Sequence, residues 1–144
     1  MNGQVNYLAV LAAAVAAMAV GFARYLPGVF GKQWLRIIGA DKLSDEERRK
    51  RQKGMGPTFS LMFAATFIGA AVLAWFIAWL DAGTLAGGIR VGFFAWLGFV
   101  VPVVTGDTLF SGRDGALEMP LFLIQAGHHL LALLVMGAVL GAWH

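Results

Sequence analysis

The chain alternates long apolar stretches with short polar segments, and the apolar stretches have the length of membrane-spanning helices. Apolar residues dominate four stretches, at about residues 5–23, 57–80, 86–105 and 119–143. A helix needs about 20 mainly apolar residues to cross a bilayer. The third stretch is the shortest, because only residues 91–106 are free of charge; starting its helix near Leu85, with Arg90 directed outward, restores the length. The pattern predicts an all-α integral membrane protein, built as a bundle of four transmembrane helices.

Proline and tryptophan mark the ends of the predicted helices. Pro27 follows the first stretch and Pro57 opens the second, where the missing N–H of proline costs little. Pro102 lies inside the third stretch, and we expect it to kink the helix there. Trp75 and Trp79 end the second stretch, as is typical of the aromatic belt at a membrane surface.

The segment 24–54 joins the first two predicted helices and contains nine of the eleven Lys and Arg residues. Its first half interleaves basic and apolar side chains, a short amphipathic pattern typical of a helix in the headgroup layer. We therefore take Lys32, Trp34 and Arg36 as candidate contacts for anionic lipid headgroups. The alternative interpretation is a loop that sets the topology and binds no ligand.

The second half of this segment predicts a charged, solvated helix over about residues 44–53. Ser44 stands three residues before Glu47, which is the spacing of a capping box. Opposite charges four residues apart on the following turn support the same helix.

The distribution of positive charge predicts the orientation of the chain. Short loops rich in Lys and Arg remain in the cytoplasm. We therefore expect a multi-pass protein of a bacterial inner membrane, with segment 24–54 in the cytoplasm and both termini in the periplasm. Residues 1–23 contain no Lys or Arg, so they lack the basic region of a signal peptide and are interpreted as a retained helix. Confinement of the positive charge to one loop also argues against nucleic acid as a partner.

Composition limits the possible functions. Of the 144 residues, 59% are hydrophobic and 13% are charged, compared with roughly 25% charged in soluble domains. Four spans and one loop use nearly the whole chain, so we expect a single membrane domain over residues 1–144 and no separate catalytic domain. The absence of cysteine excludes disulfides, thiolate nucleophiles and Cys-ligated metals.

The strongly polar side chains of the fourth apolar stretch are Gln125, His128 and His129, near the middle of the membrane. On a helix Gln125 shares a face with each histidine, whereas the two histidines point about 100° apart. The group is a candidate ligand-binding site; hydrogen bonding between helices is the alternative. No carboxylate or thiol stands at a matching spacing, so no metal site is predicted.

Charged residues at the cytoplasmic ends of the helices are a second set of candidates. Asp107 could pair with Arg24 or Arg113, which would either order the loops or contact a ligand. Ser111 lacks the strand–turn–helix context of a nucleophile elbow. We therefore predict no catalytic residue and no cofactor.

Two pairs of glycines have the spacing of close helix contacts. Gly88 and Gly92 begin the third predicted helix, and Gly137 and Gly141 lie near the end of the fourth. GxxxG pairs let the backbones of two helices approach each other. The partner helices could belong to the same chain or to a second copy, and a homo-oligomer is therefore expected as one possibility.

Three segments give the chain a family resemblance. Residues 25–34 read Tyr-Leu-Pro-Gly-Val-Phe-Gly-Lys-Gln-Trp, residues 127–130 read Gly-His-His-Leu, and residues 137–143 close the last apolar stretch. With its four apolar spans and these segments, nearly the whole chain resembles a small bacterial membrane family catalogued as domain of unknown function 1761. Members usually carry an aromatic residue at the position of Arg24 and often a tyrosine at that of His128, so His129 better matches the recurring histidine. The resemblance implies a four-span membrane fold and supplies no activity.

Three functions fit these patterns. The first is a non-enzymatic, self-associating membrane protein that binds or passes a small or lipid-like molecule around Gln125 and His129. The second is an accessory or scaffold subunit of a larger membrane complex. The third is a membrane-embedded enzyme acting on lipid or isoprenoid substrates, with a histidine as acid or base.

Overall fold

The computed structural model describes residues 5–24, 36, 42–112 and 115–143, and every regular element in this part of the chain is a helix. The elements are α1 (Tyr7–Arg24), α3 (Asp45–Lys53), α4 (Gly56–Trp79), α5 (Leu85–Ala95), the π-helical turn η3 (Trp96–Val100), α6 (Val101–Leu109) and α7 (Gly115–Ala142). The α5, η3 and α6 segments follow one another without a break. The all-helical fold agrees with the prediction.

Three helical segments are long and apolar enough to cross a membrane, namely Gly56–Trp79, Leu85–Leu109 and Glu118–Ala142. The apolar helix Tyr7–Ala23 is shorter. Lys32 and Trp34 of the expected amphipathic segment lie outside the described residues, whereas Arg36 is exposed.

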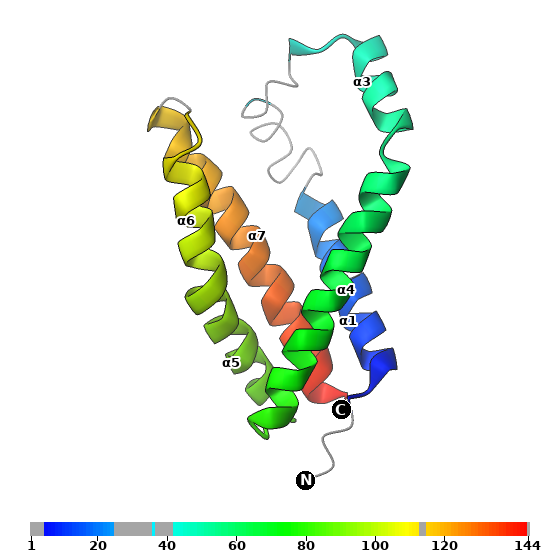
Figure 1. Cartoon of the computed structure of the whole chain (residues 1–144), viewed down its shortest axis with the longest axis vertical. Helices are drawn as coiled ribbons and strands as arrows, with labels where there is room; N and C mark the ends of the chain where they lie inside the picture. The colour runs from blue at the N-terminus through cyan, green and yellow to red at the C-terminus, as the bar shows by residue number, and fades with distance from the viewer. Residues whose placement is uncertain (1–4, 25–35, 37–41, 113–114, 144) are drawn as a thin grey trace.

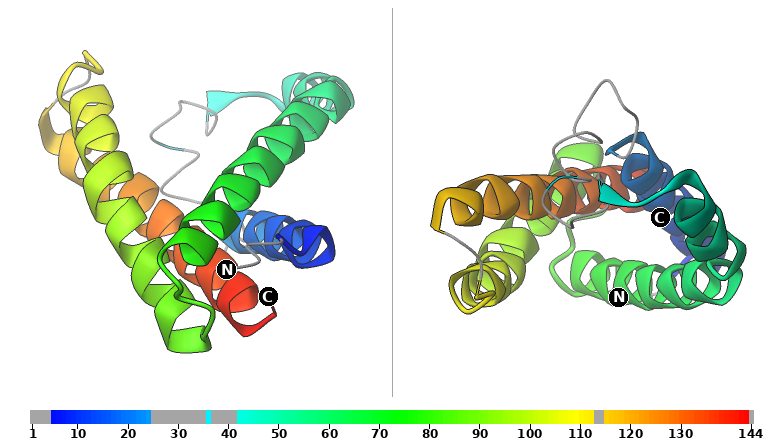
Figure 2. Two further views of the ribbon diagram at one scale, coloured as in Figure 1. Left: turned by 60° about the horizontal axis from the view of Figure 1, so that its bottom comes forward. Right: turned by 90° about the horizontal axis from the view of Figure 1, so that it is seen from above.

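The helices run alternately up and down the long axis of the molecule (Figure 1). Helix α1 begins and α7 ends at one end, which we call the terminal end, and α3 lies at the other, the α3 end. Helix α7 packs extensively against α5 and α1, and α1 packs against α4. Towards the α3 end, α6 and α7 run together and diverge from α4 (Figure 2).

The main hydrophobic core is a junction of α1, α4 and α7. Helix α1 contributes mostly alanine, and the other two helices contribute both alanine and larger side chains; the buried members are Ala9, Val10, Ala13, Ala14, Ala17, Ala70, Leu73, Ala74, Ile77, Ala132, Met136 and Leu140. Small residues on one helix let the branched and long side chains of its neighbours approach its backbone closely. The alanine-rich face of α1 is therefore a packing surface.

Helices α5 and α7 are in backbone contact through the two glycine pairs. A Cβ atom at Gly88 would overlap the carbonyl oxygen of Gly137 and would lie 2.9 Å from the Cα of Gly141. A Cβ atom at Gly92 would overlap the carbonyl oxygen of Leu133. The partner of each glycine pair thus belongs to the same chain, and α5 fills the α7 glycine face that a second copy would need.

The ends of two helices are fixed by local hydrogen bonds. At α3, the Ser44 N–H donates to Glu47 Oε2 at 2.9 Å and the Glu47 N–H donates to Ser44 Oγ at 3.3 Å, which confirms the predicted capping box. At the N-terminus of α5, Thr84 Oγ1 accepts the N–H of Gly87 at 3.0 Å. This hydroxyl satisfies one of the N–H groups that a helix start leaves unpaired.

A wide π turn precedes Pro102, in the part of the helix where we expected a kink. The N–H of Val101 donates to the carbonyl oxygen of Trp96, five residues earlier, and the helix then continues to Leu109. Proline has no N–H, and its ring crowds the carbonyl four residues before it. A single turn with wider spacing accommodates this crowding without ending the helix.

Two helices extend beyond the predicted apolar spans. The third helical segment continues past residue 105 to Leu109, and α7 begins at Gly115, before residue 119. The prediction followed hydropathy, which measures the apolar part of a helix. The backbone remains helical beyond that part, through Asp107 in α6 and Glu118 in α7.

Replacing Gly137 by alanine should lower the free energy of unfolding, because the new Cβ would overlap the Gly88 backbone and force α5 away from α7. We expect a loss of about 1–3 kcal/mol, the usual cost of overpacking. Gly127→Ala in the same helix is the matched control, since nothing lies within 4 Å of its Cβ position. It should be neutral or stabilising by up to about 1 kcal/mol. Denaturant unfolding of the full chain measures both, and equal stabilities would contradict the contact.

Candidate functional site

A hydrogen bond from Trp96 holds the π turn against α7. Its indole N–H donates to the carbonyl oxygen of Ala126 at 2.8 Å. Trp96 is half-buried and Ala126 is buried, so the bond is partly shielded from solvent. It attaches η3 to the middle of α7, on the α3 side of the glycine contacts.

The predicted polar group of α7 is divided between two directions. The centroids of the His128 and His129 rings are 5.1 Å apart, with an interplanar angle of 53°. His128 faces α1, since its Cε1 lies 3.4 Å from the Cβ position of Gly21. Gln125 and His129 are half-buried and share the adjacent face of α7.

That face continues towards the α3 end. Glu118, Phe122, Gln125 and His129 follow one another at intervals of four, three and four residues, which places them in one row along the helix. We call this row the α7 stripe. The α7 stripe leads from Gln125 and His129 to a cavity at the α3 end of the helix.

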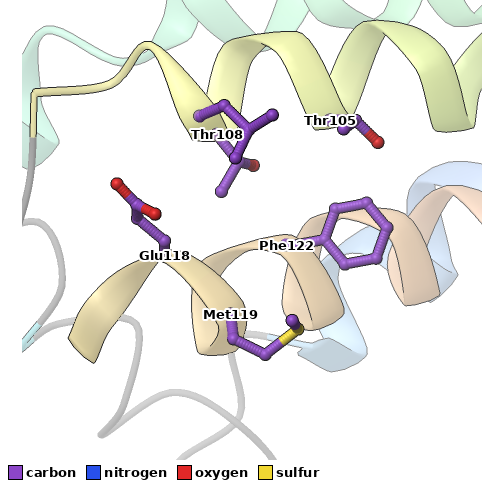
Figure 3. A pocket seen from close by; sticks show the side chains of 6 residues that line it. Thr105, Thr108, Glu118, Met119 and Phe122 are labelled. Atoms are coloured by element: carbon purple, nitrogen blue, oxygen red, sulfur yellow. The ribbon is translucent and has the colours of Figure 1, made fainter. Parts of the chain in front are cut away.

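The cavity lies between α6 and α7 and has a volume of about 290 Å³. We call it the α6/α7 pocket. Helix α6 contributes Thr105, Thr108 and Leu109, and α7 contributes Glu118, Met119 and Phe122. The Phe122 ring lies between the two helices, and the Glu118 side chain rises from α7 towards α6 (Figure 3).

Two threonines of α6 differ in how their hydroxyls are satisfied. The Thr105 hydroxyl donates to the carbonyl oxygen of Val101 at 2.7 Å, a bond within its own helix. Thr108 is only 3% exposed, and its Oγ1 is buried without a hydrogen-bond partner among the described residues. A buried hydroxyl without a partner costs about 1–3 kcal/mol. Thr108 is therefore the polar group of the pocket that a ligand could satisfy.

Glu118 is the ionisable side chain of the pocket wall. It is half-buried, and no hydrogen bond or ion pair engages its carboxylate within the described residues. Its position in the first turn of α7 is electrostatically favourable, because the N-terminus of a helix carries partial positive charge. The helix dipole thus stabilises the carboxylate at this position, and the carboxylate oxygens can still accept hydrogen bonds.

Asp107, another predicted candidate, is exposed on α6 and does not line the pocket. The side chain of Arg24 and the whole of Arg113 lie outside what the structure describes. In the described part of the chain, no three His, Asp or Glu residues come together as a metal site would require.

Sequence reasoning singled out neither the threonines of α6 nor Glu118. The signal that could have found Glu118 is its spacing from Gln125 and His129, which corresponds to one face of a helix. No sequence signal distinguishes Thr108 from Thr105, since the difference arises from where α7 packs.

A family model described as a protein of unknown function, DUF1761, matches residues 8–141. Comparison with curated proteins and with solved structures found no match. The matched region includes the glycine pairs, the α7 stripe and the α6/α7 pocket.

Replacing Trp96 by phenylalanine should remove the hydrogen bond to Ala126 while keeping an aromatic ring in place. We expect the free energy of unfolding to fall by about 0.5–1.5 kcal/mol, the net worth of such a bond. Trp79→Phe, a substitution of an exposed tryptophan at the terminal end, is the control and should change stability little. Thermal unfolding measures the two variants. If both lost the same amount, the bond would contribute nothing specific.

Proposed function

The chain belongs to the DUF1761 family of proteins of unknown function, and we propose that it is a four-helix membrane protein that binds a small amphipathic molecule between α6 and α7. The proposed binding site is the α6/α7 pocket, with the polar part of the α7 stripe beyond it. The proposed role is binding or passage of the molecule, without chemical conversion.

Membrane residence is supported by the apolar surface of the helices as well as by their length. Large apolar side chains project outward from the membrane-length segments, including Leu61 at 74% exposure and Phe99 at 68%. Contiguous apolar surface of this kind is rare on soluble monomers, whereas lipid tails solvate it readily. Helix α1, with 18 residues, extends about 27 Å, which is close to the roughly 30 Å of a hydrocarbon core. We therefore count it as the fourth span.

The proposed orientation places α3 in the cytoplasm and the terminal end in the periplasm of a bacterial inner membrane. The charge asymmetry supports it, because the segment that contains α3 carries nine of the eleven basic residues. Trp75 and Trp79, near the terminal end of α4, fit the aromatic belt of the outer surface.

The observation that carries the binding proposal is the buried Thr108 hydroxyl in a cavity with largely apolar walls. Leu109, Met119 and Phe122 provide apolar contacts, and Thr108 and Glu118 provide polar ones. Small-molecule sites typically combine apolar walls with a few placed polar groups, in cavities of about 300–1,000 Å³. At about 290 Å³ the pocket suits a small ligand or one end of a longer one.

The proposal includes no dimer through the glycine pairs. Helix α5 occupies Gly137 and Gly141 within the chain, so a homo-oligomer would have to use another face. A scaffold role does not account for the buried Thr108 hydroxyl, and we therefore rank the scaffold role second.

The orientation can be tested by labelling single cysteines, because the chain has no native cysteine. Asp45 in α3 and Asp81 in the turn between α4 and α5 are both exposed and lie at opposite ends. In intact spheroplasts an impermeant thiol reagent should label Asp81→Cys and should label Asp45→Cys only after permeabilisation. The reverse pattern would overturn the orientation.

The pocket can be tested by replacing Thr108 with valine, which keeps the shape and removes the hydroxyl. If the hydroxyl serves a ligand, the ligand-free variant should be more stable than the wild type by about 1 kcal/mol, because a buried unpaired group is gone. Co-purified small molecules should decrease at the same time. Thermal unfolding in lipid nanodiscs and mass spectrometry of bound species are the two measurements.

Thr66→Val is the matched control for this substitution. The Thr66 hydroxyl donates to the Met62 carbonyl oxygen at 2.8 Å within α4, outside the pocket. This variant should change stability by less than about 0.5 kcal/mol and should retain the bound species. Destabilisation by Thr108→Val, with unchanged bound species, would favour the scaffold role.

A further inference from the structure

We propose that the molecule bound in the α6/α7 pocket carries a protonated amine with N–H groups, attached to an apolar chain. Glu118 would act as its counter-ion, and Thr108 would accept one of its hydrogen bonds. This inference rests on the proposed function and identifies the chemical class of its ligand.

The polar groups of the pocket wall are mainly hydrogen-bond acceptors. The ionised Glu118 carboxylate has two acceptor oxygens and no donor. The Thr105 hydroxyl has committed its proton to Val101 and keeps its two lone pairs, and the Thr108 hydroxyl has its proton and both lone pairs unused among the described residues. A ligand rich in donors satisfies such a wall, and an ammonium group offers three N–H donors.

Charge favours the same ligand. Among the described residues that line the pocket, Glu118 is the one ionisable side chain, and no described residue forms a hydrogen bond or ion pair with its carboxylate. A half-buried carboxylate beside apolar side chains gains from a cation at short distance, because the surroundings screen less than water does. A carboxylate or phosphate ligand would instead be repelled.

The apolar residues specify the rest of the molecule. Leu109, Met119 and Phe122 line the pocket around the polar groups, and the flexible thioether of Met119 adapts to irregular shapes. The cavity of about 290 Å³ holds a head group and the first part of a chain. The remainder of a longer chain would lie along the exposed apolar surface.

The helix dipole gives Glu118 a second, purely structural role, so stability alone cannot test the inference. The experiment therefore compares ligands that share a chain and differ in the head group. Labelled decylamine, decanol, decyltrimethylammonium and decanoate are titrated onto the full chain in phosphatidylglycerol nanodiscs, with binding to empty nanodiscs subtracted. Phosphatidylglycerol supplies no amine.

The wild type should bind decylamine roughly tenfold or more tightly than decanol, since charge-assisted hydrogen bonds are about twice as strong as neutral ones. Decyltrimethylammonium should bind less tightly than decylamine, because it lacks N–H donors for Thr108. Decanoate should bind worst. Equal binding of decylamine and decanol would overturn the inference while leaving the pocket proposal intact.

Glu118→Gln should abolish the preference for decylamine over decanol, because the variant loses the charge that distinguishes the two probes. Asp107→Asn is the matched control: it removes a carboxylate from the exposed side of α6 and should keep the preference. Loss of the preference in both variants would assign it to general surface charge and would overturn the inference. If no probe bound above the empty nanodiscs, the pocket proposal itself would fail.

The amine could belong to a free molecule or to a lipid headgroup, and a further arm distinguishes the two sources. Adding phosphatidylethanolamine to the nanodiscs should displace decylamine if the natural ligand is an aminolipid. Unchanged decylamine binding would indicate a free amphiphilic amine. Both results support a ligand that carries an ammonium group. They distinguish only whether this group belongs to a lipid headgroup or to a free molecule.

Discussion

The backbone contact between α5 and α7 determines how the rest of the molecule is arranged. At Gly88, Gly137 and Gly141 no side chain separates the two helices, so their distance is set by main-chain atoms. Helix α7 is at the same time packed against the alanine-rich face of α1, which in turn packs against α4. Small residues on two sides of α7 thus close the bundle at the terminal end. Towards the α3 end, side chains such as Leu109, Met119 and Phe122 line the space between α6 and α7.

The pocket is a consequence of this change in packing along one pair of helices. Along this pair of helices the glycine contact comes first and the hydrogen bond between Trp96 and Ala126 comes next. Thr108 and Phe122 lie beyond that bond, towards the α3 end. The π turn before Pro102 lets α6 continue past α7 instead of breaking off. Pro102 thus lies in a helix that continues without a break to Thr108 and the proposed site.

The sequence predicted the features that depend on short spacings. Hydropathy located the helices, Ser44 and Glu47 indicated the capping box, and the glycine spacings marked close-contact faces, although not whose helix would fill them. The features that depend on three-dimensional packing could not be predicted. The π turn before Pro102 is one of them, because the sequence shows the proline but not how the preceding turn relaxes around it. The difference between Thr105 and Thr108 likewise arises only when α7 covers one side of α6.

The glycine contact also has a mechanical consequence. Glu118 lies 19 residues before Gly137 along α7, which is roughly 28 Å at 1.5 Å per residue. If the contact acts as a fulcrum, each degree of rotation between the two helices moves the pocket walls apart by about 0.5 Å over that lever arm. Glycine surfaces lack the interlocking side chains that resist such rotation. A rotation of a few degrees at the closed end would therefore move the pocket walls by about 1–2 Å.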